Sequence, residues 1–261
     1  MTAVVAAIGR SGARQLSVIG GLARFALRVA RAAARLSRGG AVVTLRVLVN
    51  QIRFTAIQAV GLVTLLAALL SFLVIAQAAN QLGRFGALEQ IGTIMVVAVI
   101  RELGPLMTAL IVVSRSGTAI AAEMATNKVM GEVTALEAMG IDPYIYLVLP
   151  RMLGAIASVA CLMVLFDAVA LVSGYIGAAI YADMSVQGYS RIVLATLSAK
   201  DVWITVFKGL FYGAAVALFC CFHGLAVTAG PTEIPQAVTR GVVGTIVAIF
   251  IMSAVFVVVA A

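Results

Sequence analysis

The feature that most constrains this chain is a series of long apolar stretches that carry almost no charge. A helix needs about 20 apolar residues to cross the hydrocarbon core of a bilayer. Five stretches reach this length, at residues 57–76, 91–122, 152–182, 202–227 and 241–261. With 63% hydrophobic and only 11% charged residues, the chain is not a soluble globular protein. We predict an all-α membrane protein with five transmembrane helices, because backbone polar groups in lipid must be satisfied within each helix.

The second stretch is interrupted by Arg101, Glu102 and Arg115, and Gly104-Pro105 follow the first charged pair. Proline removes a helix hydrogen bond, and packing against other helices can absorb the defect inside a membrane. The sequence therefore predicts one long, locally distorted span.

Two more charges lie within apolar stretches, Asp167 in the third and Lys208 in the fourth. A charge at the centre of a membrane helix costs about 2.5–3.5 kcal/mol, so such residues usually face the bundle interior or a wet cavity and find partners. Asp167 with Lys208 is a candidate pair. Arg101 and Glu102 point about 100° apart on a helix, so each is expected to pair with another helix or with a ligand head group. Purely structural pairing is the alternative.

An arginine stripe marks the N-terminal region, residues 1–53. Helical spacing places Arg24, Arg28, Arg31, Arg35 and Arg38 on one face, with Leu22, Phe25, Val29, Ala33 and Leu36 opposite, and Gly39-Gly40 end the helix. Such a helix is suited to lie in the membrane interface beside anionic head groups. A solvated helix, or one packed against protein, is the alternative. The remainder, residues 54–261, forms the membrane domain.

Basic residues predict the orientation. With the N-terminus inside, twelve Lys and Arg residues lie on the cytoplasmic side, whereas three, Arg84, Arg191 and Lys200, lie outside. The positive-inside rule favours this arrangement, which puts the C-terminus on the outer side. The apolar run from Ala3 to Ile8 is too short for a signal peptide, so we expect the N-terminus to be retained.

The polar segment between the second and third spans contains residues typical of helix starts and ends. Thr126 or Asn127 is a candidate N-cap for a helix at residues 128–139, Gly140 a stop signal, and Asp142-Pro143 a turn. Its apolar ridge is Val129, Val133, Leu136 and Met139 or Gly140, with Glu132 and Glu137 on other faces. Such a helix could dock in a groove of a soluble partner or pack on its own bundle.

The chain lacks the residue patterns of several enzyme classes. None of its lysines follows a glycine, so it has no GxxxxGK[ST] phosphate loop and cannot itself be a P-loop ATPase. One histidine, His223, cannot build an HExxH zinc site, and GxSxG is absent. The cysteines Cys161, Cys220 and Cys221 lie in apolar runs and indicate no metal site. Nucleic acid is a poor explanation for the positive charge. We therefore expect no enzyme activity, cofactor or metal in this chain.

Several blocks resemble the MlaE/YrbE permease family, the membrane subunits of MCE-associated ABC lipid transporters. They are Arg101-Glu102-Leu103-Gly104-Pro105, Arg115-Ser116-Gly117, Ala121-Ala122-Glu123, Ala135-Leu136-Glu137-Ala138-Met139-Gly140-Ile141-Asp142-Pro143, Pro150-Arg151 and Thr239-Arg240. Their order and spacing also agree, and the similarity covers residues 40–261.

The resemblance implies a homodimer in the bacterial inner membrane, assembled with two copies of a cytoplasmic ABC ATPase that binds ATP and with a periplasmic ring of MCE proteins. A small cytoplasmic STAS-type protein is a further possible partner. Phospholipid would enter a cavity between the two permeases, in support of outer membrane lipid asymmetry. The residues implied in ATPase coupling are Glu132, Val133, Leu136, Glu137, Met139, Gly140 and Asp142. The lipid-cavity candidates are Arg101, Glu102, Leu103, Leu70 and Val74.

Two other functions fit the residues alone. An ion-coupled secondary transporter of an apolar substrate could use Asp167, Glu102 and Lys208 to relay protons or bind ions. A structural membrane scaffold would need no cavity.

Overall fold

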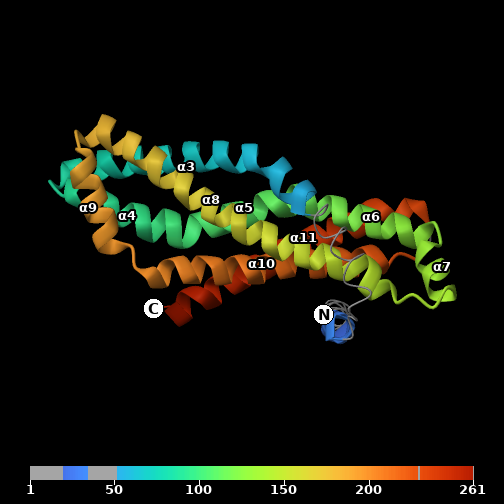
Figure 1. The fold of residues 1–261 in the computed structure, drawn as a ribbon. Helices are drawn as coiled ribbons and strands as arrows, with labels where there is room; N and C mark the ends of the chain where they lie inside the picture. The colour runs from blue at the N-terminus through green and yellow to red at the C-terminus, as the bar shows by residue number, and fades with distance from the viewer. Residues whose placement is uncertain (1–19, 35–51, 229, 261) are drawn as a thin grey trace, which may run out of the picture.

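The protein is described from a computed structural model, at residues 20–34, 52–228 and 230–260. Within these ranges nearly every residue is helical and none lies in a strand. Five helical segments are long and apolar enough to cross a membrane: Thr55–Arg84, Leu88–Val129, Tyr144–Ala182, Ala199–Leu225 and Pro231–Val259. They run lengthwise through one bundle (Figure 1). The prediction of an all-α membrane protein with five spans is thereby confirmed.

Each span is built from one or more helical elements. The first is η1 (Arg53–Ile57) with α3 (Gln58–Arg84), and the third is η5 (Tyr144–Val148) with α8 (Leu149–Ala182). The fourth is α10 (Ala199–Leu225), and the fifth is η6 (Pro231–Glu233) with α11 (Ile234–Ala260). The fifth helix thus begins before the predicted Gly241, because the polar residues that precede Gly241 continue the helix.

The second span is irregular, as predicted. Its elements are η2 (Leu88–Gln90), α4 (Ile91–Ile94), η3 (Met95–Leu103), α5 (Gly104–Val112), η4 (Val113–Gly117) and α6 (Thr118–Val129). Both η3 and η4 are π-helical. The wider turns of η3 end at Gly104-Pro105, where proline cannot donate the usual helix hydrogen bond.

Small residues bring the helices close together. On α3 every fourth residue is buried, including Ala67, Ser71 and Ile75, and Ser71 donates a hydrogen bond of 2.6 Å to the Ala170 carbonyl of α8. On α10, a Cβ at Gly213 would lie 2.6 Å from the Ile156 Cα of α8. Its backbone therefore approaches α8 more closely than any side chain would allow.

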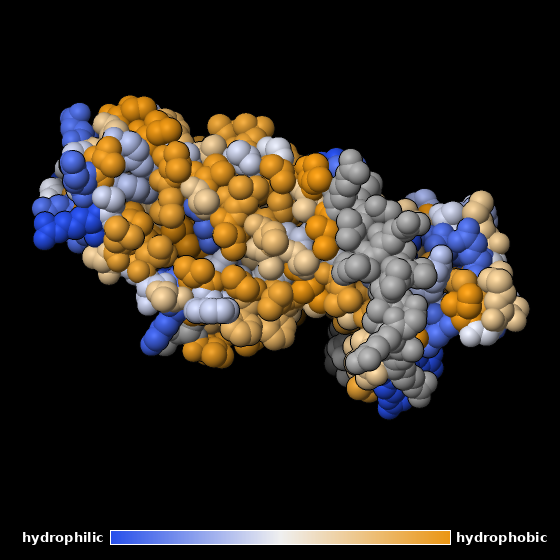
Figure 2. All heavy atoms as spheres, in the orientation of Figure 1, coloured by the Kyte–Doolittle hydropathy of each residue, from blue (hydrophilic) through white to orange (hydrophobic). Residues whose placement is uncertain are grey.

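Apolar side chains cover the middle of the molecule, and hydrophilic ones gather toward its two ends (Figure 2). In the most apolar part of the fifth span only 17% of the residues are buried within the chain, and in the first span 28%. These two spans therefore present wide apolar faces to lipid or to another protein.

Residues 20–34 form a helix that lies across the bundle near its α7 end (Figure 1). Phe25 packs on Tyr144 and Phe222, at ring-centroid distances of 5.5 and 5.7 Å. Leu22 and Val29 are also buried, and Arg24, Arg28 and Arg31 are exposed, as their spacing predicts. The prediction for Ala33 was wrong, because it is exposed and Ala32 is buried instead. This apolar face packs on protein, and the placement of the helix in the membrane interface stays a prediction. Other predicted residues, Arg35, Leu36, Arg38, Gly39 and Gly40, lie outside the described residues.

The predicted helix at residues 128–139 was wrong at its start. Helix α6 continues through Val129, and α7 (Glu132–Ala138) begins only after Gly131, whose φ of +78° breaks the helix. The stop at Gly140 is confirmed by its φ of +73°. The turn at Asp142 is also confirmed, since its Oδ1 accepts from the Tyr144 N–H at 2.9 Å.

Helix α9 (Val186–Thr196) was not predicted. Its N-cap is Ser185, whose hydroxyl accepts from the Gly188 N–H at 3.2 Å. This local signal, together with the spacing of the buried Tyr189 and Val193, could have revealed it. Helices α9 and α7 lie at opposite ends of the bundle, and α11 ends toward α9 (Figure 1).

Candidate functional site

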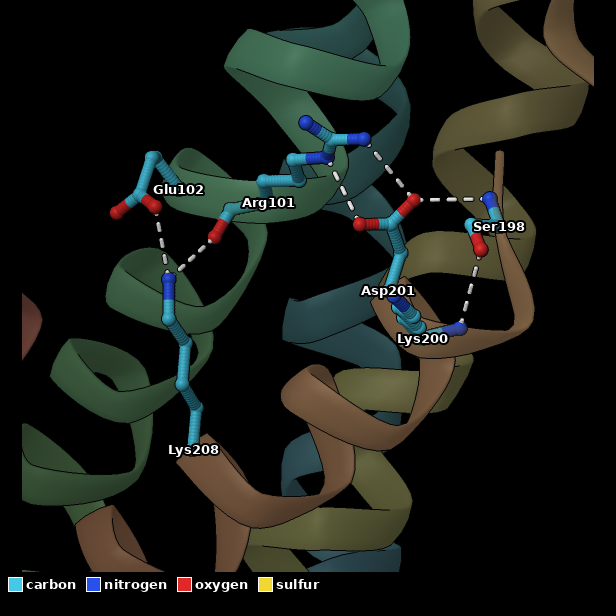
Figure 3. A network of polar contacts seen from close by, with 6 residues as sticks. All are labelled: Arg101, Glu102, Ser198, Lys200, Asp201 and Lys208. Atoms are coloured by element: carbon cyan, nitrogen blue, oxygen red, sulfur yellow. Dashed lines mark hydrogen bonds and ion pairs between the residues drawn. The ribbon is translucent and has the colours of Figure 1, made fainter. Parts of the chain in front are cut away.

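A buried lysine forms the centre of a charged network within the spans. The Lys208 side chain of α10 is 3% exposed, and its Nζ donates 2.8 Å to Oε1 of Glu102 on η3 (Figure 3). The same Nζ donates 2.7 Å to the Arg101 carbonyl oxygen. Since an unpaired charge in lipid is costly, this ion pair permits both residues to lie in the membrane.

The contact with the Arg101 carbonyl has a cause in the sequence. In an α-helix this carbonyl would accept from the N–H four residues later, but that residue is Pro105, which has none. Lys208 supplies a donor from the neighbouring helix instead. Lys208 thus gains an acceptor within the membrane, and the Arg101 carbonyl gains a donor in place of the missing proline N–H.

The Arg101 side chain points to the start of α10 (Figure 3). Its Nε lies 2.9 Å from Oδ1 of Asp201, and its Nη2 donates 3.1 Å to Oδ2. Asp201 also accepts from the Ser198 N–H at 2.9 Å, as the acidic member of a capping box. One carboxylate therefore caps α10 and binds the arginine of the second span.

These contacts settle the pairing question. Arg101 and Glu102 each pair with another helix, as predicted from their angular separation. The prediction that Asp167 pairs with Lys208 was wrong, because Lys208 reaches Glu102. Asp167 lies instead against Gly104, where a Cβ would be 2.8 Å from Oδ1, and its polar neighbour on α10 is Thr205.

The network extends to α11 through Ser253, whose hydroxyl donates 3.1 Å to Oε2 of Glu102. The carboxylate thus lies directly behind the helix with the widest exposed apolar face. The other lipid-cavity candidates, Leu103, Leu70 and Val74, are half-buried. Asp201, Ser198 and Ser253 were missed from the sequence, although Ser198-x-x-Asp201 has the spacing of a capping box.

Arg115 lies apart from this network. Its guanidinium donates to the backbone carbonyl of Gln58 and, at 3.1 Å, to the Gln58 side-chain oxygen. Since Gln58 is the first residue of α3, Arg115 ties the second span to the start of the first.

Helix α7 attaches to the bundle by one face. Val133 and Leu136 are buried, in a cluster that also contains Leu147. Glu132, Glu137 and Gly140 are exposed, Met139 is 65% exposed, and Asp142 is half-buried. Of the predicted coupling residues, Val133 and Leu136 therefore attach α7 to the bundle. Glu132, Glu137, Met139 and Gly140 form the exposed surface of α7 and its end, and Asp142 lies in the turn that follows.

An ion pair holds the two spans that carry α7. Arg151 of α8 is buried; its Nε donates 3.3 Å to Oε2 of Glu123 on α6, and Nη2 contacts the other carboxylate oxygen at 2.5 Å. Both ends of the α7 loop are thereby fastened together.

Comparison with known proteins gives a consistent result. The family model described as Permease MlaE matches residues 48–259. A probable ABC transporter permease protein of Rickettsia prowazekii is 30% identical over 207 residues, which is 79% of this chain and 80% of the relative. A probable ABC transporter permease protein of Synechocystis is 32% identical, over 67% of this chain and 66% of the relative. The intermembrane phospholipid transport system permease protein MlaE of Haemophilus influenzae is 28% identical, over 61% of each chain.

Proposed function

Because this chain belongs to the MlaE permease family, we propose that it is the membrane subunit of an ABC-type transporter that moves phospholipid between the bacterial inner membrane and an MCE protein. The observation that carries this proposal is the family match over residues 48–259, which includes all five spans. The name of the Haemophilus relative specifies phospholipid transport.

In this proposal two copies of the chain enclose the lipid. The exposed apolar faces of α3 and α11 support it, because a lone permease would leave both uncovered. The acyl chains would lie against these faces, with Leu70 and Val74 among the candidate contacts. Glu102 and Arg101 would lie near the head group, since the Arg101 side chain is 41% exposed and can approach a phosphate without leaving Asp201.

The energy would come from a separate ATPase that binds ATP and docks on α7. Support comes from the outer surface of this helix, where Glu132 and Glu137 accompany the exposed Met139. Val133 and Leu136 bury the opposite face, so a push on α7 would act on the whole bundle end. The Glu123–Arg151 pair would pass that motion to α6 and α8 together.

The other assignments follow from the family and from charge. The α7 end would be cytoplasmic and the α9 end periplasmic, which puts the end of α11 on the periplasmic side. An MCE ring would meet the α9 end, and a STAS-type protein is a further candidate partner on the cytoplasmic side.

The test is co-purification of the tagged chain with its ATPase from native membranes in mild detergent, followed by measurement of ATP hydrolysis. Glu137→Lys places a cation on the outer surface of α7 and should remove the ATPase from the preparation. Glu89→Lys is the matched control, since Glu89 is exposed in η2 near the α9 end. If Glu137→Lys retains a normally active ATPase, the assigned coupling surface is wrong.

A second assay separates this function from an ion-coupled secondary transporter. Proteoliposomes of the chain with its partners should transfer fluorescent phospholipid only when ATP is supplied. Transfer by the chain alone, driven by an ion gradient without nucleotide, would refute the ABC mechanism.

A further inference from the structure

A small cavity lies between the helix at residues 20–34 and the bundle. Gly21, Arg24, Phe25 and Arg28 line it from the helix, at the i, i+3, i+4 and i+7 positions that share one helical face. Tyr144 from η5 and Phe222, Leu225 and Ala226 at the end of α10 line the other side, and the volume is about 270 Å³. Gly21 permits the close approach, since a Cβ there would lie 3.0 Å from the Phe222 ring.

The polar groups of this cavity favour an anion. Arg24 and Arg28 are one helical turn apart, and like charges at that spacing repel each other. None of the described residues that line the cavity is acidic. Arg28 Nη1 donates 3.2 Å to the Tyr144 hydroxyl oxygen, so the hydroxyl proton remains available for another acceptor. That hydrogen bond raises the pKa of Arg28 further, and an arginine guanidinium is charged at any physiological pH. Two cations and one hydroxyl can thus converge on a single anion.

The place of the cavity in the fold indicates the source of that anion. Tyr144 is the first residue of the third span and Leu225 the last residue of the fourth, so both mark the same edge of the membrane-spanning region. Lipid phosphates lie at this depth. Phe25, Phe222 and Leu225 provide an apolar wall beside the cations, as expected where acyl chains begin below a head group.

We propose that this cavity binds the phosphate of an anionic phospholipid of the cytoplasmic leaflet and thereby holds the helix at residues 20–34 against the bundle. Its volume is slightly below the range of about 300–1,000 Å³ usual for small-molecule sites, which suits a head group, with the acyl chains outside. Assignment of the leaflet rests on the proposed orientation; the anion chemistry does not.

This site is distinct from the charged network. Lys208 and Leu225 are separated by about 25 Å along α10, at 1.5 Å per residue. A lipid bound here is therefore not at the position proposed for transported lipid.

The test is native mass spectrometry of the full chain in detergent, titrated with short-chain phosphatidylglycerol, with phosphatidylcholine and with sodium phosphate. Arg24→Gln and Arg28→Gln should each weaken binding of one phosphatidylglycerol by about tenfold, because each removes a charged hydrogen-bond donor. Arg31→Gln is the matched control, since it removes the same charge from an exposed position of the helix that does not line the cavity. Thermal melting of each variant without added lipid verifies its fold.

The outcomes are distinguishable. Loss of the tight phosphatidylglycerol in Arg24→Gln and Arg28→Gln but not in Arg31→Gln supports the proposal, as does weaker binding of phosphatidylcholine. An equal effect in Arg31→Gln would indicate diffuse attraction and overturn it. Binding of free phosphate as tightly as phosphatidylglycerol would identify an inorganic-anion site and likewise overturn it. The proposed transport function fails separately, in the ATP-driven lipid transfer assay.

Discussion

Replacement of Lys208 by methionine tests whether the intramembrane network is dry. The substitution keeps most of the side-chain volume and removes the Nζ that contacts Glu102 and the Arg101 carbonyl. Glu102 would then remain as a carboxylate with one hydrogen bond, from Ser253. The Arg101 carbonyl would lose the donor that replaces the missing proline N–H.

The magnitude follows from burial. Breaking a buried ion pair by removal of one partner costs about 3–5 kcal/mol. The Lys208 side chain is 3% exposed but that of Glu102 is 34% exposed, so the carboxylate retains some hydration. We therefore expect Lys208→Met to lower the free energy of unfolding by about 3 kcal/mol, the low end of that range. With Glu102→Gln added, no charge is left unpaired, and the loss should fall to about 1 kcal/mol.

The assay is unfolding of the purified chain in mixed micelles with increasing SDS, followed by tryptophan fluorescence and circular dichroism. Lys200→Met is the matched control, because Lys200 is an exposed lysine in the first turn of the same helix. Its effect should stay within about 0.5 kcal/mol. The double-mutant cycle of Glu102 and Lys208 should give a coupling energy of more than about 2 kcal/mol, because Glu102→Gln alone also leaves the buried Lys208 unpaired.

A hydrated network would behave differently. Exposed ion pairs contribute only about 0–1 kcal/mol. If Lys208→Met lowers the free energy of unfolding no more than Lys200→Met does, then the Lys208–Glu102 pair lies in water. The inference that this ion pair is desolvated and stabilises the packing of α10 on the second span is then refuted.

Two further substitutions test the packing and the helix start. Gly213→Leu should prevent the close contact with Ile156, because a Cβ at position 213 would lie 2.6 Å from the Ile156 Cα, and it should lower the yield of folded protein in detergent. Gly61→Leu, where a side chain meets open space, should leave the yield unchanged. Equal yields from the two variants would contradict the close approach of α8 and α10. Asp201→Asn should lower the free energy of unfolding by about 1–2 kcal/mol, since it weakens the cap of α10 and the ion pair with Arg101. An SDS unfolding curve identical to that of the unchanged protein would show that this carboxylate does not contribute to stability.

The spans were predictable because their signal is local. Each apolar stretch is long enough to cross a bilayer, and a distortion of the second span near Gly104 follows from Pro105. The second π-helical segment, η4, has no such signal in the sequence. Helix ends were less predictable, since polar residues continue α11 before Gly241 and a positive φ at Gly131 separates α6 from α7. Gly131 is the local signal for that break, since glycine is the usual residue at the left-handed position that ends a helix.

The pairing of charges could not be predicted in full from the sequence. Angular spacing showed that Arg101 and Glu102 face different neighbours, but the neighbour of each depends on the register between helices. Lys208 reaches Glu102 rather than Asp167 because α10 packs closely on α8 through glycines and meets η3 along its other face. The apolar ridge of α7 was ambiguous for the same reason, since burial of Val133 and Leu136 is a tertiary property.

The link between Pro105 and Lys208 has a consequence for how this sequence can change over time. An alanine at position 105 alone would restore the backbone donor and compete with Lys208 for the Arg101 carbonyl. An apolar residue at position 208 alone would leave both that carbonyl and Glu102 without their partner. Loss of Lys208 alone therefore destabilises the protein, and a backbone donor at position 105 makes that loss better tolerated. Positions 105 and 208 should therefore vary together among related sequences, although more than a hundred residues separate them in the chain.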